Sequence, residues 1–241
     1  MNRSLFFSIL ILFFSGNVSA SEQVVLDQVT INVHNKPSLQ RGAKIFVNNC
    51  LGCHTLKYQR YSKFINHLGM SKKMIEKNLI FTSDRYGEPT KIGSLMINAV
   101  DSEFSREAFG ISPPDLSLIV RSRGADWVYT FLTSFYRDDS RPFGVNNTLY
   151  PNVSMPHALW WMEGLKEPMK GNSKKYNYVL TGTLSEKEYK QSITDLVNFL
   201  AYVSEPAQLE RYKIGFWVIL FLLLFAFVAF LLNREYWRDI E

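Results

Sequence analysis

The sequence predicts a mostly α-helical chain with long loops and one C-terminal transmembrane helix, and two observations predict it. Apolar residues recur at helical spacing in several separate segments, with prolines and glycines between them. Near the C-terminus, the run from Ile214 to Leu232 contains 19 residues without a charge. At about 1.5 Å per residue this run spans roughly 28 Å, close to the thickness of the hydrocarbon layer of a membrane.

The N-terminus predicts export. Residues 1–20 carry Arg3, then an apolar run from Leu5 to Phe14, then Val18-Ser19-Ala20 as a small-residue cleavage site. This order is typical of a secretory signal peptide that is removed, with a retained signal anchor as the alternative. We therefore expect residues 21–207 to form a domain outside the cytoplasm, in the bacterial periplasm.

The first mature segments predict an arm and a helix. Residues 21–37 alternate between apolar and polar side chains up to Pro37, which favours an extended arm along the domain surface. Ser38 then has the position of a helix cap, and the helix is expected to run through about Asn49 with Gly42 as a small residue on one face.

The next five residues, Cys50-Leu51-Gly52-Cys53-His54, carry the chemistry. The pattern C-x-x-C-H is the attachment site of a c-type haem: both thiols form thioether bonds with one porphyrin, and the histidine ligates the iron. The chain has only two cysteines and no second Cys/His cluster, which argues against zinc. His54 has no role in a thioredoxin-type dithiol. A covalent haem c, one per chain, and a cytochrome c-type haem domain are therefore expected.

Residues 55–100 are rich in Lys and Arg and in loops, with a helix expected from about Ser71 to Leu79 and with Met74 and Leu79 facing inward. An ordinary solvated face explains this charge better than a surface for an acidic partner or an anionic lipid. The formal net charge is +5. Because long basic runs with interleaved aromatics are absent and the chain is exported, nucleic-acid binding is excluded.

Two short helices are expected after this region. Pro113 and Pro114 predict the start of a helix that continues to about Arg123 and ends at Gly124. Asp126 is expected to cap the next helix, whose apolar stripe would pack against the porphyrin or the protein core; the stripe consists of Trp127, Val128, Phe131, Leu132 and Phe135.

The segment 141–161 holds three prolines and many apolar residues, and a long irregular loop of this kind is usually functional. This loop contains two candidates for the sixth iron ligand. The full set of candidates is Met70, Met74, Met96, Met155, Met162, Met169, His34, His67 and His157. Met155 is favoured by its position on this loop, where Pro156 stiffens the chain, and His157 is the main rival. An open iron that binds gases or peroxide is a further alternative.

The C-terminal part predicts two helices. Ser185 and Glu188 form a capping box that precedes an amphipathic helix ending at Glu205-Pro206, and this helix is expected to pack across the first one. Residues 208–232 are then predicted as a membrane anchor with an apolar core over 214–232 and flanking aromatic residues. If the signal is cleaved, the anchor crosses the inner membrane once and the tail, 233–241, lies in the cytoplasm.

Together these motifs resemble the cytochrome c1 family over about residues 38–232. The resemblance rests on the haem motif and on an ordered set of further motifs: Pro113-Pro114-Asp115-Leu116-Ser117, Arg121-Ser122-Arg123, Asn146-Asn147, Pro151 to His157, Asp195 to Leu200, Glu205-Pro206 and the terminal anchor.

The resemblance implies the haem subunit of a quinol:cytochrome c oxidoreductase, the cytochrome bc1 complex. Such a subunit takes one electron from the Rieske iron–sulfur protein and passes it to a cytochrome c, alongside cytochrome b in a dimeric complex, with no bond-making catalysis of its own. An independent anchored cytochrome that feeds a terminal oxidase is the alternative.

The resemblance also implies site residues. Met155 becomes the sixth ligand, Arg123 and Arg121 take the positions of haem-propionate partners, and Pro114 adjoins the haem. Trp127 stands where the family often has a hydrogen-bonding tyrosine.

Overall fold

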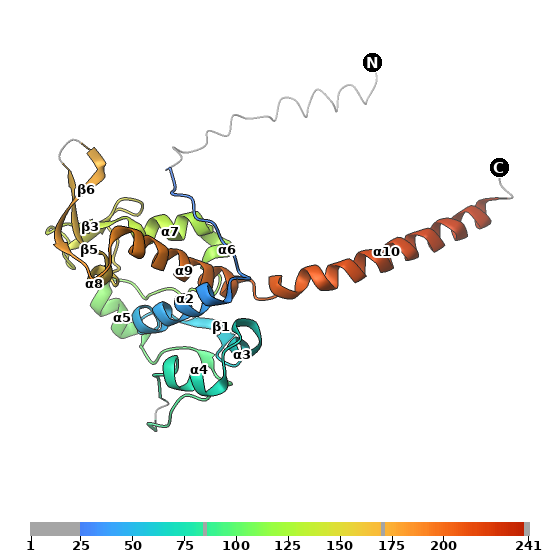
Figure 1. The fold of residues 1–241 in the computed structure, drawn as a ribbon, viewed down its shortest axis with the longest axis horizontal. Coiled ribbons are helices and arrows are strands. Elements are labelled where there is room, and N and C mark those ends of the chain that lie inside the picture. Colours follow the sequence, from blue (N-terminus) through green and yellow to red (C-terminus); the bar gives the residue numbers. More distant parts are fainter. Residues whose placement is uncertain (1–24, 84–85, 170–171, 239–241) are drawn as a thin grey trace, which may run out of the picture.

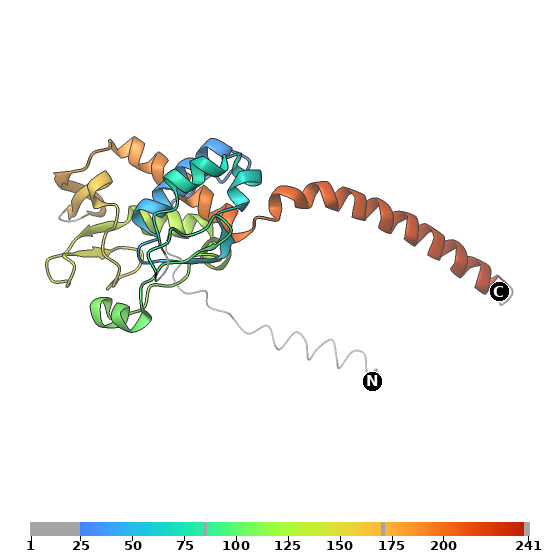
Figure 2. The same cartoon turned by 90° about the horizontal axis from the view of Figure 1, so that it is seen from below.

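The structure, a computed structural model, describes residues 25–83, 86–169 and 172–238. The packed part of the chain is mostly helical, and α10 (Gln208–Trp237) leaves it as one long helix (Figures 1 and 2). The mostly α-helical fold class is therefore confirmed. The predicted signal peptide, residues 1–20, lies outside the described residues.

The remaining elements follow in chain order. They are α2 (Lys36–Asn49), β1 (Leu56–Arg60), α3 (Lys63–Leu68), α4 (Lys72–Asn78), β2 (Leu95–Met96), α5 (Ser102–Phe109), α6 (Ile119–Arg123), α7 (Ala125–Thr133), β3 (Phe135–Arg137), β4 (Val145–Asn147), α8 (Trp160–Glu163), β5 (Gly164–Met169), β6 (Asn172–Thr181) and α9 (Glu186–Ser204). The strands form three two-stranded antiparallel sheets: β1 with β2, β3 with β4, and β5 with β6.

Helix α9 packs across α2, as predicted, and both helices contribute to the main core. Gly42 makes the crossing possible, because a Cβ at this position would lie 2.1 Å from the backbone oxygen of Asp195. The Asp195 carboxylate is buried and accepts hydrogen bonds from Ser38 Oγ at 2.6 Å and Arg41 Nε at 2.5 Å. Close backbone approach and a satisfied buried charge thus fix the two helices against each other.

The described part of the N-terminal arm is extended and follows the domain surface, as expected. Its backbone N–H groups donate to side chains of two helices: Asp27 to Thr130, Val29 to Asp126 and Asn32 to Asn198, at 2.8–2.9 Å. These contacts attach the arm to α7 and α9.

Three of the predicted helix starts are wrong. Asn35, not Ser38, caps α2, since its side chain accepts a hydrogen bond from Ser38 N. Gly124, not Asp126, precedes α7, because the Asp126 carboxylate accepts from the N-terminal arm instead. Residues 113–117 are not helical, and α6 begins only at Ile119.

The helix α4 matches its prediction apart from one side chain. Ser71 caps it, and Ile75 and Leu79 are buried. Met74 was expected to face inward, but it is exposed, because Ile75 takes the inward position.

Helix α9 matches its prediction, whereas α10 continues to Trp237, five residues beyond the end predicted for the anchor, Leu232. The capping box of Ser185 and Glu188 begins α9. Within α10, the candidate membrane span is Ile214–Trp237, with a mean hydropathy of 2.9. Only residues 205–207 link α9 to α10, and Glu205 in this link forms ion pairs with Arg121, at 3.7 Å, and with Arg211.

Candidate functional site

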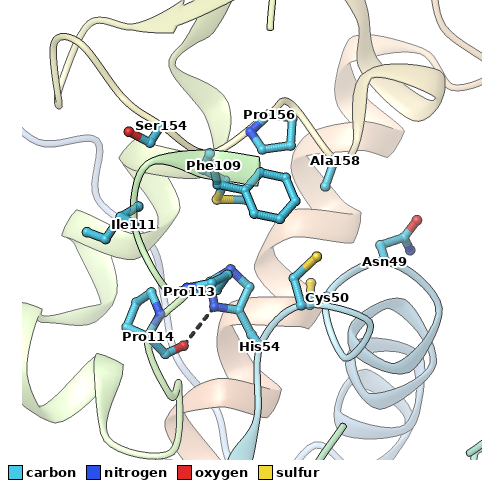
Figure 3. A pocket seen from close by; sticks show the side chains of 12 residues that line it. Asn49, Cys50, His54, Phe109, Ile111, Pro113, Pro114, Ser154, Pro156 and Ala158 are labelled. Carbon is cyan, nitrogen blue, oxygen red and sulfur yellow. Dashed lines mark hydrogen bonds between the residues drawn. The ribbon is translucent and has the colours of Figure 1, made fainter. Parts of the chain in front are cut away.

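The end of α2 places both thiols and His54 beside one cavity. Cys50 follows the last helical residue, and its carbonyl oxygen accepts from Cys53 N at 3.0 Å and from His54 N at 2.8 Å. This tight turn gathers the motif at one point of the fold. Cys50, Cys53 and His54 line a cavity together with Asn49 at the end of the helix (Figure 3).

A second, larger cavity of about 340 Å³ adjoins the first, of about 100 Å³. Residues common to both walls are Cys50, His54, Ile111, Pro114, Ser154 and Met155. In the close view, Ser154 and Pro156 lie on the opposite side of the cavity from His54 (Figure 3). The loop that contains Met155 therefore faces the motif across a largely apolar space.

Met155 differs from the other candidate ligands in its surroundings. His157 is buried against Glu163, while Met70, Met96 and Met162 belong to the main core. Met74 and Met169 are exposed, and His34 and His67 line a different cavity near the start of α10. Among the described residues, Met155 is the candidate that lines the cavities shared with His54.

The His54 imidazole is held by the backbone at Pro114. Its Nδ1–H donates to the Pro114 carbonyl oxygen at 2.7 Å, which leaves Nε2 free (Figure 3). Burial lowers the pKa of His54, although the bond to Pro114 and the Asp115 carboxylate act in the opposite direction. A neutral ring with a free Nε2 lone pair is the form that ligates a metal.

The surroundings of Cys50 do not favour a reactive thiolate. Burial, with a further contribution from neighbouring Cys53, raises the pKa of Cys50 to about 12. A reactive dithiol needs a lowered pKa, so the electrostatics argue against a thioredoxin-type function.

The two predicted arginines have different surroundings. Arg123 lines the larger cavity, and its guanidinium carbon lies 5.1 Å from the ring centroid of Trp127, which lines it too. Arg121 is in neither cavity wall as described, and its Nη1 pairs with Glu205 at the start of the link to α10. Only Arg123 is therefore placed beside the cavities.

The loop that carries Met155 is anchored by two asparagines. Asn146 Oδ1 accepts from Asn147 N at 2.9 Å and from Asn152 N at 2.8 Å. Asn147 donates to the Phe131 carbonyl oxygen at 2.8 Å and accepts from Leu149 N and Tyr150 N. Sequence reasoning had noted these asparagines only as a motif.

Sequence reasoning missed one group near the site completely. Glu163 and Lys166 are buried and paired with each other, and His157 also contacts Glu163. The signal was present in the segment Trp160 to Leu165, where a single acidic residue interrupts an apolar stretch and a lysine follows.

The residues fit a c-type haem. Two free thiols, an imidazole with an available Nε2 and a thioether surround a mostly apolar space with one guanidinium at its wall. Within the part of the chain that the structure describes, no group of three or more His, Cys, Asp or Glu side chains could hold a metal ion without such a cofactor.

A helical domain with this donor set and, among the described residues, one candidate membrane helix is typical of membrane-anchored c-type cytochromes. The sequence model of the Cytochrome C1 family matches residues 27–240. The chain therefore belongs to the cytochrome c1 family, and family membership implies a c-type haem and a place in respiratory electron transport.

The sequence is similar to those of individual relatives over most of their lengths. The chain is 42% identical over 225 residues to cytochrome c1 of Allochromatium vinosum, covering 90% of each chain. It is 40% identical over 225 residues to a Nitrosomonas europaea protein named ammonia monooxygenase gamma subunit, covering 92% of each. It is 24% identical over 223 residues to the cytochrome b-c1 complex catalytic subunit of Candida albicans, covering 85% of this chain and 72% of that one.

Proposed function

We propose that this chain is a membrane-anchored, mono-haem electron carrier whose iron is ligated by His54 and Met155. The haem is attached covalently through Cys50 and Cys53. The observation that carries the proposal is the placement of His54 and Met155 in the walls of the same two adjoining cavities. If His54 and Met155 both hold the iron, it would be closed to gases and peroxide, which disfavours an open-iron enzyme or sensor.

The haem supplies a one-electron couple when it is bound, and the protein supplies ligation, burial and electrostatics. Pro114 O orients the His54 ring through Nδ1. Buried apolar residues such as Val128, Leu132 and Val153 line the larger cavity and would exclude water from it. Arg123 is the cation placed to pair with a propionate.

The assembly we propose is a quinol:cytochrome c oxidoreductase of the cytochrome bc1 type. The chain would accept one electron from a Rieske iron–sulfur protein and pass it to a cytochrome c, next to cytochrome b in a dimer. Family membership supports this assembly, and so does the name of the Candida albicans relative, a subunit of a cytochrome b-c1 complex.

The proposed topology is a single pass through the inner membrane. After cleavage of residues 1–20, residues 21–207 would lie in the periplasm, the anchor would span the membrane, and residues 233–241 would lie in the cytoplasm. The candidate span at Ile214–Trp237 supports one crossing, although it includes the first five residues of the predicted tail.

The deciding experiment is purification in a mild detergent followed by an optical redox titration. We expect a cytochrome b and a Rieske protein to co-purify, and the haem of this chain to be reduced when a quinol is added. A chain that purifies with an oxidase, or alone, would instead favour the independent cytochrome that feeds a terminal oxidase.

The Nitrosomonas europaea relative adds a second candidate assembly, because its printed name assigns it to an ammonia monooxygenase. The same purification separates the two. Monooxygenase subunits in place of cytochrome b and the Rieske protein would overturn the bc1 assignment and leave the haem ligation to be judged by spectroscopy.

A further inference from the structure

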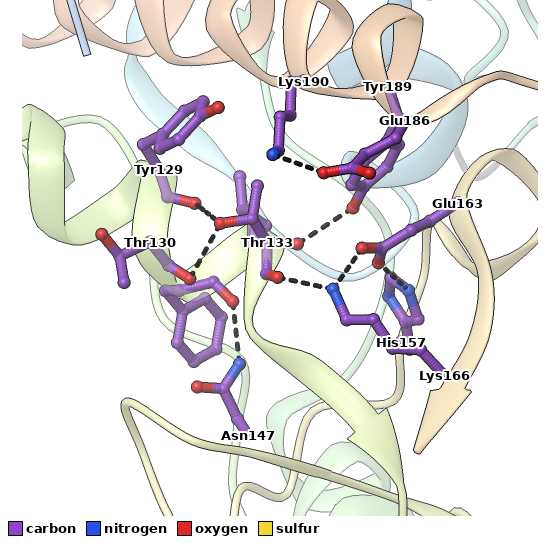
Figure 4. A network of polar contacts seen from close by, with 12 residues as sticks. Tyr129, Thr130, Thr133, Asn147, His157, Glu163, Lys166, Glu186, Tyr189 and Lys190 are labelled. Carbon is purple, nitrogen blue, oxygen red and sulfur yellow. Dashed lines mark hydrogen bonds and ion pairs between the residues drawn. The ribbon is translucent and has the colours of Figure 1, made fainter. Parts of the chain in front are cut away.

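Three buried polar side chains meet beside the loop that carries Met155. Glu163 at the end of α8 and Lys166 on β5 form an ion pair, and the Glu163 side chain is only 3% exposed. His157 Nε2 lies 2.9 Å from the other carboxylate oxygen of Glu163. Lys166 Nζ also donates to the Thr133 carbonyl oxygen at 2.7 Å (Figure 4). We refer to Glu163, Lys166 and His157 as the Glu163 cluster.

The cluster contains charges in a place where charge is costly. A buried ion requires a partner and satisfied hydrogen bonds, and a buried pair contributes little stability compared with apolar residues of the same volume. Both Glu163 oxygens are in use, one by Lys166 and one by His157. Such a cluster can still fix one arrangement of the chain, because each charge holds its partner in place.

The element that this arrangement fixes is the end of the loop after Met155. The His157 ring is held by Glu163 and also stacks on the buried Phe135, with ring centroids 4.9 Å apart and planes within 3°. Met155 packs against the same small group of apolar residues that contains Phe135. Only Pro156, whose φ is restricted, separates Met155 from His157.

We propose that the Glu163 cluster positions Met155 as the sixth ligand. Glu163 and Lys166 hold His157, and His157 fixes the loop two residues from the thioether. Together with Asn146 and Asn147 on the preceding side, the loop is then held at both ends. His157 is in this view a positioning residue and not a ligand. The inference rests on the proposed ligation by Met155 and adds the residues that maintain it.

The test uses two variants of the full-length, haem-loaded protein. Glu163→Gln leaves the Lys166 cation buried without its carboxylate, and His157→Phe keeps the ring on Phe135 but removes the bond to Glu163. In both we expect weaker methionine–iron(III) charge-transfer absorption. We also expect carbon monoxide to bind the reduced protein roughly tenfold or more faster. The loss of a buried ion-pair partner, or of a hydrogen bond to a buried charged group, is large enough to shift a population tenfold. Covalent haem content should not change.

The chain provides a matched control. Glu167 neighbours Lys166 on β5, but it is half-exposed and pairs with Arg137 at 3.3 Å. Glu167→Gln makes the same chemical change outside the cluster and should leave the charge-transfer band and the carbon monoxide rate at wild-type values. A loss of fold unrelated to the ligand would instead appear as lost helix content and lost haem.

The outcomes separate this inference from the function on which it rests. If the wild-type protein lacks the charge-transfer band, ligation by Met155 fails. If the wild type has the band, Met155→Leu abolishes it, and folded His157→Phe or Glu163→Gln retains it fully, the positioning role alone is overturned. Should Glu163→Gln fail to fold, His157→Phe decides, because it leaves the Glu163–Lys166 pair intact.

Discussion

The two walls of the cavity are built differently. On the His54 wall, both thiols and the imidazole come from five consecutive residues that follow α2, with one distant contact to Pro114. On the opposite wall, Met155 lies on a loop. Asn146, Asn147 and His157 hold this loop in place through hydrogen bonds, and His157 contacts a buried ion pair. Under the proposed function, attachment of the cofactor would depend on one local segment, whereas closure of its far side would depend on contacts distributed along the chain.

The largest effect is expected from loss of the two cysteines on the His54 side of the cavity. In Cys50→Ser/Cys53→Ser no thioether bond can form, so covalent haem should be lost completely, while α2 and α9 retain the contact at Gly42 that does not involve the thiols. Haem staining of a denaturing gel, with immunodetection of the chain, measures this. Covalent haem in the double variant would contradict the attachment site.

The next largest effect is expected from replacement of Met155, the proposed ligand on the opposite side of the cavity. Met155→Leu keeps both thioethers but removes the soft sulfur that favours the reduced iron. We expect the haem to stay attached and its midpoint potential to fall by on the order of hundreds of millivolts. An optical redox titration measures the fall, and an unchanged midpoint would remove Met155 from the ligand set.

A smaller effect is expected at the anchor that precedes the ligand. Asn147 is fully buried, and its side chain makes three hydrogen bonds to the backbone. Asn147→Ala leaves these backbone groups without partners and should lower the free energy of unfolding by about 2–3 kcal/mol. Denaturant unfolding checks the value, and Asn48→Ala, an exposed site on α2, is the control.

The cavity-lining arginine should tune the midpoint more weakly than the ligand does. A cation near the iron favours the reduced form, so Arg123→Gln is expected to lower the midpoint by some tens of millivolts. Arg121→Gln is the matched control, since Arg121 pairs with Glu205 away from the cavity walls. Equal shifts in both variants would place the two arginines at similar distances from the haem.

The smallest effect is expected at Asp115, on the His54 side of the cavity, and concerns how stability depends on pH. Burial acts to raise the pKa of Asp115, but hydrogen bonds from Thr55, Ser117 and Lys57 outweigh it and lower the pKa below the ordinary value of 3.8. The carboxylate thus adds stability that is present above that value and is lost as the pH falls through the folded-state pKa. Asp115→Asn should cost about 1 kcal/mol near neutrality. Unfolding curves of both proteins should converge in acid.

The sequence was informative where structure is local. The haem motif, the capping box of α9 and the apolar run in α10 each lie within one continuous segment, so their patterns are visible without knowledge of the fold. Residues 113–117 also had a local pattern, but the helix expected there does not form. The backbone of this segment instead bonds to the turn after α2, with Pro114 O accepting from His54 and Leu116 N donating to Thr55 O.

The sequence was least informative where tertiary contacts decide. The β5–β6 hairpin was not predicted, because charges at Lys166 and Glu167 interrupt any regular alternation. Burial of Lys166 becomes understandable only once the Thr133 carbonyl oxygen, 33 residues earlier in the chain, is known to accept from it beside Glu163. Partners that are distant in sequence leave no periodicity to detect.

The short connection between α9 and α10 has a consequence for how electrons travel. Three residues link the helices, and Glu205 within them pairs with arginines on either side, Arg121 of α6 and Arg211 of α10. Fully extended, three residues span only about 10 Å, so the domain cannot move far from the start of α10. In the proposed assembly, the cavity would therefore stay at a nearly constant height above the lipid, and the proteins that deliver and collect electrons would do the moving.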